Sequence, residues 1–129
     1  MTKNVFITGA SRGIGKAIAH AFAKEGYHLY LLCKNNLASM QEYASFLEKE
    51  YCVQTHCYAA DLADPQALES LLDTLPDMDV IVNNAGISYV GLLTDMTICE
   101  WNQIINTNLT SAFVICRKFL PGMIQRRSG

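Results

Sequence analysis

Two kinds of hydrophobic pattern alternate along the chain. Short runs rich in apolar residues occur at 5–7, 27–33, 53–60 and 79–84, and such runs are typical of strands buried on both faces. Between them, apolar residues recur every three or four positions, as on one face of a helix. Strands that alternate with helices predict βαβ units and a parallel sheet. With right-handed crossovers, we expect a doubly wound α/β fold with strand order 3-2-1-4.

The helical stretches carry signals for their ends. A helix is predicted from about residue 13 to 25, because Gly26 follows where a helix would stop. Its expected buried face consists of Ile14, Ala17, Ile18, Ala21 and Phe22. Further along, Asp64 and Pro65 indicate a helix start, with aspartate as the cap and proline at the first helical position.

The last predicted helix begins at a capping box formed by Thr97 and Glu100. Its apolar stripe runs through Trp101, Ile104, Ile105, Leu109, Ala112, Phe113 and Cys116. Asn108 interrupts this stripe. A buried amide without a partner costs on the order of 1–3 kcal/mol, so we expect its side chain to form hydrogen bonds. Pro121 is expected to leave a carbonyl unpaired and to kink the helix.

The first strand leads into a turn rich in glycine. Residues 8–15 read Thr-Gly-Ala-Ser-Arg-Gly-Ile-Gly, and a helix pattern follows directly. A strand, a glycine turn and a helix N-terminus together present backbone N–H groups to a phosphate. In that arrangement Gly9 turns the chain off the strand, Gly13 admits a pyrophosphate, and Gly15 lets the helix pack on the sheet. The alternative is a glycine-rich capping turn that binds no nucleotide.

Composition narrows the functional classes. The 129 residues predict one domain, half of them are apolar, and the net charge of −2 gives no sign of nucleic-acid binding. No apolar stretch approaches the roughly 20 residues of a membrane span, so no membrane partner is expected. The five cysteines form no CxxC pair and are expected to be reduced thiols. The three histidines lack metal-ligand spacing, so no metal site is predicted.

The residues after the second strand discriminate between the nicotinamide dinucleotides. In a dinucleotide fold, an acid about 20 residues beyond the glycines binds the ribose 2′-hydroxyl of NAD. That position falls on Asn35, and its neighbours Lys34 and Asn36 are not acids either. Lys34, together with Arg12 from the glycine turn, instead suits the 2′-phosphate of NADP(H) through charge-assisted hydrogen bonds. The alternative is that both are solvated surface charges.

The turn at residues 8–15 and the element Asn83-Asn84-Ala85-Gly86 resemble two motifs of the short-chain dehydrogenase/reductase family. The resemblance covers the whole chain and implies the first half of that family's Rossmann-type fold. The glycine turn is most similar in wording to that of 3-oxoacyl-[acyl-carrier-protein] reductases, which act in fatty acid biosynthesis. It implies an NADP(H)-dependent, cytoplasmic homo-oligomer that reduces a small-molecule carbonyl or acyl-thioester substrate.

The resemblance also implies a set of site residues. The cofactor-binding positions are Gly9, Ser11, Arg12, Gly13, Ile14, Gly15, Lys34, Asn35, Asp61, Leu62, Asn83, Ala85 and Gly86. Among these, Asp61 would contact the adenine amino group, and Asn83 would lie beside the ribose and nicotinamide. Asn108 matches the asparagine that breaks the helix and holds a water for the family's catalytic lysine.

The family's catalytic serine, tyrosine and lysine have no counterparts at the expected places. Tyr30 and Lys34 have the Tyr-x-x-x-Lys spacing, but in a predicted strand four residues span about 13 Å rather than one helical turn. We therefore expect a chain that ends before the family's fifth strand and is inactive alone. It is expected either to associate through its fourth strand or last helix, or to be only marginally stable. The alternatives are a non-catalytic nucleotide-binding or assembly module and an inert fragment.

Overall fold

The computed structural model describes residues 1–129, and a parallel sheet lies at its centre. The four strands are β1 (Asn4–Thr8), β2 (His28–Cys33), β3 (Thr55–Ala59) and β4 (Val80–Val82). They lie in the order β3-β2-β1-β4, and β1 pairs in parallel with both β2 and β4. The predicted strand order is therefore confirmed. The ends of β3 and β4 fall one or two residues inside the predicted ranges.

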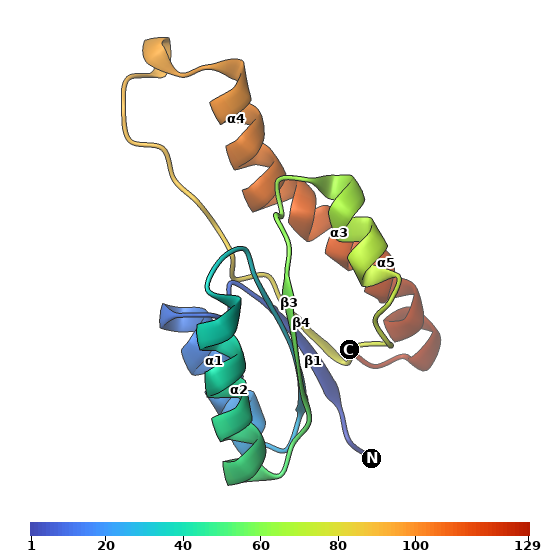
Figure 1. Ribbon diagram of the computed structural model, residues 1–129. Helices are drawn as coiled ribbons and strands as arrows, with labels where there is room; N and C mark the ends of the chain where they lie inside the picture. Colours follow the sequence, from blue (N-terminus) through green and yellow to red (C-terminus); the bar gives the residue numbers. More distant parts are fainter.

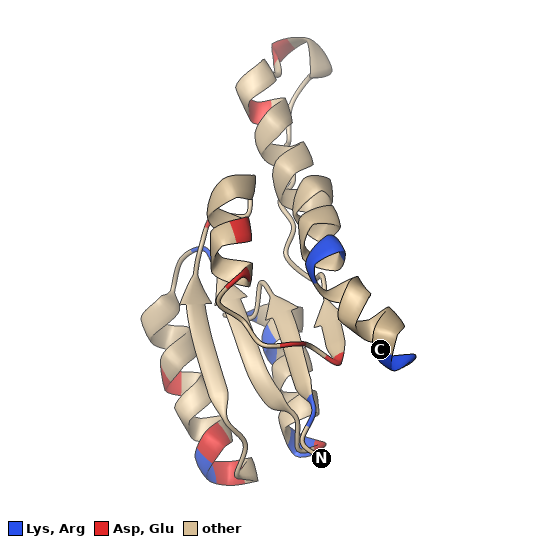
Figure 2. Ribbon diagram, turned by 90° about the vertical axis from the view of Figure 1, so that its right-hand side faces the viewer, with Lys and Arg blue, Asp and Glu red and all other residues tan.

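Helices cover both faces of the sheet (Figure 1). One layer consists of α1 (Gly13–Lys24) and α2 (Leu37–Tyr51), and the other of α3 (Pro65–Leu72) and α5 (Ser111–Arg126). Between β4 and α5 lie a short 3₁₀ helix, η1 (Leu93–Asp95), then α4 (Ile98–Ile105) and a π-helical turn, η2 (Asn106–Thr110). Together, α4, η2 and α5 form one continuous helical rod. In Figure 2 the α4 end of this rod extends beyond the sheet and carries few charged residues.

The strands divide the core into two clusters. Val5 and Ile7 of β1 pack under α1 and α2, whereas Phe6 points to the α3 and α5 side, and all three are fully buried. Successive side chains of a strand face opposite sides, so a strand covered on both sides is apolar throughout. The predicted strands are therefore apolar throughout because helices cover both faces of the sheet.

The buried face of α1 differs from the predicted one. The buried residues are Gly15, Ala19 and Ala23, whereas Ile14 is 74% exposed. Ile18 and Phe22, from the expected face, are only partly buried. Small residues let the helix axis lie close to the sheet, and this close packing takes precedence over the burial of the largest side chains. The helix is therefore rotated relative to the stripe that hydrophobicity alone indicates.

The predicted helix ends are confirmed. Asp64 caps α3, its carboxylate accepting a hydrogen bond of 3.1 Å from the Ala67 N–H. Thr97 and Glu100 form the reciprocal capping box of α4, with N–H···O distances of 2.8 and 3.1 Å. Gly26, just past α1, has a φ of +80°, a conformation that favours glycine.

The last helix differs from its prediction in two ways. It is interrupted by the π-helical turn η2, and much of its expected apolar stripe faces outward, with Leu109 64% and Phe113 59% exposed. The buried face instead includes Val114, Ile115 and Phe119. A π turn adds a residue to one helical turn, which shifts the register of the faces that follow it. Helix α5 continues through Pro121, which is assigned within it.

No helix in the structure combines the length and the apolar character that a bilayer crossing requires. All five cysteines are free thiols. Cys33 is buried, Cys57 and Cys116 are half-buried, and Cys52 and Cys99 are exposed. Burial, with smaller contributions from Cys33 and Glu48, raises the pKa of Cys57 to about 11, so this thiol is neutral at ordinary pH.

Candidate functional site

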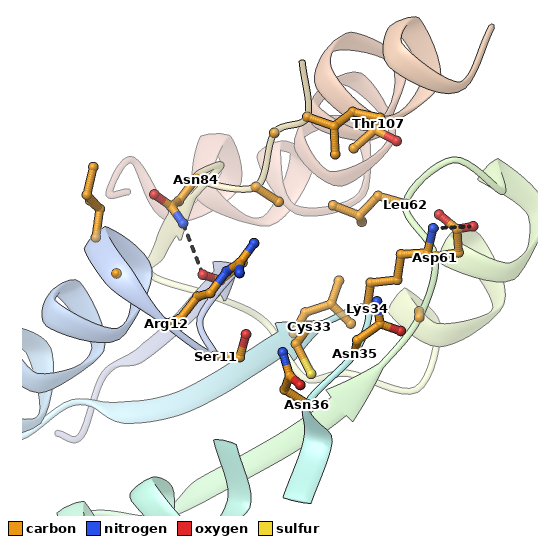
Figure 3. Close-up of a pocket in the computed structure, with 18 of the residues that line it drawn as sticks. Ser11, Arg12, Cys33, Lys34, Asn35, Asn36, Asp61, Leu62, Asn84 and Thr107 are labelled. Atoms are coloured by element: carbon orange, nitrogen blue, oxygen red, sulfur yellow. Dashed lines mark hydrogen bonds and ion pairs between the residues drawn. The ribbon is translucent and has the colours of Figure 1, made fainter. Parts of the chain in front are cut away.

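A cavity of about 630 Å³ opens where the carboxyl ends of the strands meet. Each strand contributes residues that follow its last position: Gly9 after β1, Lys34 after β2, Asp61 after β3 and Asn84 after β4. The remaining lining residues are Ser11, Arg12, Gly13, Ile14, Leu32, Cys33, Asn35, Asn36, Ala60, Leu62, Ala85, Gly86, Ile87, Gln103 and Thr107. Ligands of open α/β sheets bind at this edge (Figure 3).

The glycine turn presents free backbone donors to one side of the cavity. Gly9 and Gly13 have φ values of +65° and +56°, which other residues adopt at a cost. The N–H groups of Gly13, Ile14 and Gly15, in the first turn of α1, donate to no acceptor in the structure. The positive end of the α1 dipole lies at the same place. These donors are suited to an anionic ligand, in the way of a phosphate at a helix N-terminus.

Asn84 joins the glycine turn to the end of β4. Its side-chain Nδ2 donates to the carbonyl oxygens of Thr8 and Gly9, both at 3.1 Å. In return, Thr8 Oγ1 accepts from the backbone N–H groups of Asn84 and Ala85, at 3.2 and 3.0 Å. These four hydrogen bonds make the two sequence motifs a single structural unit.

The close packing of this unit explains two glycines. A Cβ on Gly9 would lie 2.9 Å from Asn84 Nδ2, and one on Gly15 would lie 2.6 Å from the same atom and against the Gly9 carbonyl. By contrast, a Cβ on Gly13 would meet nothing within 4 Å, and Gly13 itself lines the cavity. Gly9 and Gly15 are therefore required by packing, and Gly13 by its backbone conformation.

The charged side chains of the cavity wall are mainly cationic. Arg12 precedes α1 and its guanidinium forms no hydrogen bond or ion pair, whereas Lys34 Nζ lies 3.5 Å from Asp61 Oδ2. Asn35 and Asn36 follow Lys34, so the end of β2 carries no acid that could accept from a ribose hydroxyl. A cavity with free N–H donors, two cations and no carboxylate at this strand end fits a dinucleotide with an additional phosphate.

Asp61, Leu62 and Thr107 form another part of the cavity lining. Leu62 is 6% exposed and lies beside Asp61, and Thr107 from η2 completes this side. Asp61 Oδ1 accepts from the Ala63 N–H at 2.9 Å, which fixes the carboxylate in a turn. Burial raises the pKa of the Cys33 thiol, so this side chain adds no negative charge to the wall.

Three of the predicted site residues lie outside the cavity lining. Gly15 is buried under the glycine turn, and Asn83 directs its side chain to Cys116 Sγ, at 3.6 Å. Asn108 is exposed rather than buried, and its amide contacts the loop after β4. Its Oδ1 accepts from the Ile87 N–H at 2.8 Å, and its Nδ2 donates to the Ile87 carbonyl at 2.7 Å. The expectation that this amide is hydrogen-bonded is confirmed.

The other predicted cofactor-binding residues line the cavity, and their contact with a cofactor stays a prediction. Residues that the sequence did not indicate line it as well, among them Asn84, Asn36, Gln103 and Thr107. Asn36 has a φ of +64°, which asparagine tolerates better than most residues, so its position in an Asn-Asn pair was a usable signal. Gln103 and Thr107 reach the cavity only through the packing of the last helix.

The structure also confirms that Tyr30 and Lys34 cannot act as a helical pair. Tyr30 lies inside β2, where it is 8% exposed within the α3 and α5 cluster. Lys34 follows the end of the same strand and lines the cavity. Their side chains therefore lie in different parts of the molecule.

Comparison with known proteins relates the whole chain to short-chain dehydrogenases and reductases. The profile of the family described as short chain dehydrogenase matches residues 3–129. A 3-oxoacyl-[acyl-carrier-protein] reductase FabG of Staphylococcus aureus is 37% identical over 100% of this chain and 54% of its own. An uncharacterized oxidoreductase, YmfI of Bacillus subtilis, is 35% identical with the same coverage. The chain thus spans about half the length of the curated relatives it matches.

Solved structures agree in fold. L-sorbose reductase from Gluconobacter frateurii, complexed with NADPH and L-sorbose, has a TM-score of 0.88 and 30% identity over 97% of this chain and 49% of its own. A metagenomic short-chain oxidoreductase in complex with NADP has a TM-score of 0.89 and 30% identity over 98% of this chain and 58% of its own. The similarity extends over the sheet and both helical layers.

Proposed function

The chain belongs to the short-chain dehydrogenase family, and we propose that it forms the NADP(H)-binding part of a carbonyl reductase. The observation that carries this proposal is the pair of cations, Arg12 and Lys34, at a cavity edge where β2 ends without an acid. A 2′-phosphate gains charge-assisted hydrogen bonds from such a pair, whereas a 2′-hydroxyl lacks the carboxylate that it prefers.

The proposed roles of the chain follow from the donors at each place. The pyrophosphate is held by the free N–H groups of Gly13 and Ile14, and the 2′-phosphate by Arg12 and Lys34. The adenine lies beside Asp61 and Leu62, and the ribose next to nicotinamide lies along Ala85 and Gly86. When bound, NADPH supplies a hydride from C4 of its nicotinamide.

The proposed substrate is a 3-oxoacyl thioester or a related small carbonyl compound. Support comes from the FabG relative, whose name states that activity, and from the NADP and NADPH complexes of the structural neighbours. These 129 residues hold no tyrosine and lysine four positions apart on a helix, so we propose that they bind cofactor without turning substrate over. Asn108 stays a proposed catalytic position, and its side-chain amide is hydrogen-bonded to the backbone of Ile87.

We also propose that the protein is a homo-oligomer. The outward side of the last helices exposes Trp101, Leu109 and Phe113, each at least half exposed. Glu100 is the one charged residue from Met96 to Cys116. Exposed apolar side chains gathered on one rod are typical of association surfaces.

The test is a fluorescence titration of the intact protein with NADPH and with NADH. We expect NADPH to bind more tightly, because the 2′-phosphate adds contacts that NADH lacks. Replacement of Arg12 or Lys34 by alanine should weaken NADPH binding on the order of tenfold, the value of one charge-assisted hydrogen bond, and leave NADH nearly unchanged. Lys24→Ala is the matched control, since Lys24 is an exposed cation in the last turn of α1, away from the cavity.

Equal affinity of the wild type for the two dinucleotides would contradict the proposed selectivity. An R12A or K34A variant with an unchanged affinity ratio would contradict the assigned residues. Consumption of NADPH by these 129 residues on addition of a 3-oxoacyl thioester would contradict the proposed lack of turnover.

A further inference from the structure

The two cations of the proposed 2′-phosphate site differ in their surroundings. Arg12 has no ionic partner, whereas Lys34 Nζ lies 3.5 Å from Asp61 Oδ2, with both side chains about half exposed at 52% and 45%. Figure 3 shows this ion pair at one side of the cavity and Arg12 at another. One cation is thus free to meet a phosphate, and the other is already paired with a carboxylate.

The fold brings this ion pair together. Cys33, the last residue of β2, is in register with Ala59, the last residue of β3, so Lys34 and Asp61 follow neighbouring strand ends. The Ala60 N–H donates to the Cys33 carbonyl at 3.0 Å and extends the pairing beyond the strands. The carboxylate is held by the Ala63 N–H, while the lysine side chain has only its ionic contact. Lys34 is therefore the partner that can move.

We propose that Asp61 sets the selectivity of the site by competing with the 2′-phosphate for Lys34. This inference rests on the proposed function, because it concerns the same cofactor site. The carboxylate and the phosphate are both anions, so a phosphate drawn to Lys34 is also repelled by Asp61. Asp61 therefore lowers the preference for the phosphorylated dinucleotide below the value that Arg12 and Lys34 alone would give.

The competition by Asp61 affects only ligands that carry a 2′-phosphate. A ligand without a 2′-phosphate does not bind Lys34. The competition between Asp61 and a 2′-phosphate therefore leaves the affinity for that ligand unchanged. Any contact between Asp61 and an adenine ring contributes equally to ligands with and without the phosphate. The ratio of the two affinities therefore isolates the competition from the adenine contact.

The experiment measures this ratio with 2′,5′-ADP and 5′-AMP, which differ only in the 2′-phosphate, by calorimetry on the intact protein. Asp61→Asn removes the charge and keeps an oxygen that can accept from Ala63. We expect the 2′,5′-ADP preference of the variant to rise by roughly two- to fivefold, the range of a half-exposed ion pair. In a Lys34→Gln background the same change should be smaller, because the contested cation is gone.

Asp73→Asn is the matched control, since Asp73 pairs with Lys118 at 2.8 Å and lies outside the cavity. It should leave the ratio unchanged. Far-ultraviolet circular dichroism and thermal melting verify that each variant is folded. An unchanged or lowered ratio in folded D61N would overturn the inference.

The outcomes separate this inference from the proposed function. If the wild type shows no preference for 2′,5′-ADP and R12A has no effect on the ratio, the proposed cofactor fails. If the wild type prefers 2′,5′-ADP and only D61N leaves the ratio unchanged, the proposed cofactor stands and the competition by Asp61 fails.

Discussion

Asn84 shows how a single side chain can set the geometry of the cavity. Its amide bridges to the carbonyls of Thr8 and Gly9, so the end of β4 and the glycine turn keep a fixed relation. Because both acceptors are backbone groups, the contact holds the chain and not a particular side chain. The N–H groups of the first α1 turn then stay directed at the place where a phosphate is proposed to bind.

Substitution of Gly15 tests this packing. A Cβ there would lie 2.6 Å from Asn84 Nδ2 and against the Gly9 carbonyl, so Gly15→Ala should destabilise the protein by at least about 2 kcal/mol. Gly13→Ala is the comparison, because its Cβ meets nothing within 4 Å and only its φ of +56° is strained. That strain costs about 1–2 kcal/mol. Urea denaturation measures both; a G15A variant as stable as the wild type would show that the turn repacks freely.

For individual residues, the sequence predicted helix caps and turns, but it did not predict contacts between distant segments. The cap at Asp64 and the turn at Gly9 follow from residue type and near neighbours. The bond from Asn84 to Thr8 joins residues 76 positions apart, and no local pattern distinguishes Asn84 from Asn83. The fold sends one asparagine side chain under the glycine turn and the other toward Cys116.

Among the elements, the last helix departs most from a regular pattern. Its π-helical turn carries Asn108, whose amide bonds both to the N–H and to the carbonyl of Ile87. This pair of bonds ties the loop after β4, which lines the cavity through Gly86 and Ile87, to the helix. A helical prediction from periodicity assumes 3.6 residues per turn, so it misplaces the faces beyond an inserted residue.

Asn108→Ala should loosen this loop without unfolding the helix. Two hydrogen bonds at a solvent-exposed position are lost, and we expect a destabilisation of about 1 kcal/mol together with faster hydrogen exchange at the Ile87 amide. Asn102→Ala is the matched control, because Asn102 is exposed on α4 and its side chain has no hydrogen-bond partner. Unchanged exchange at Ile87 in N108A would mean that other contacts hold the loop.

Element order and sheet topology were the most predictable features of the whole molecule. The alternation of buried strands and helices predicts a parallel sheet, and right-handed crossovers leave few strand orders, among them the observed 3-2-1-4. The rotation of α1 was not predictable from hydrophobicity, since Gly15, Ala19 and Ala23 are buried for their small size. The cavity itself arises from four strand ends and the last helix, and only part of its wall could be predicted.

The proposed self-association is tested on the outer face of the last helices. Phe113→Glu places a charge on a side chain that is 59% exposed, so the folded monomer should tolerate it while an apolar interface should not. We expect sedimentation velocity to show a shift toward monomer. Asn102→Glu adds the same charge at another exposed position of the rod and should leave the assembly unchanged. A wild-type protein that sediments as a monomer at all concentrations would contradict the proposed homo-oligomer.

A crystal structure of the intact protein with NADP⁺ would show directly whether the dinucleotide occupies the proposed cofactor site. We predict the pyrophosphate on the N–H groups of Gly13 and Ile14, and the 2′-phosphate between Arg12 and Lys34. A bound dinucleotide whose phosphates lie away from the glycine turn, or whose 2′-phosphate contacts neither cation, would contradict it.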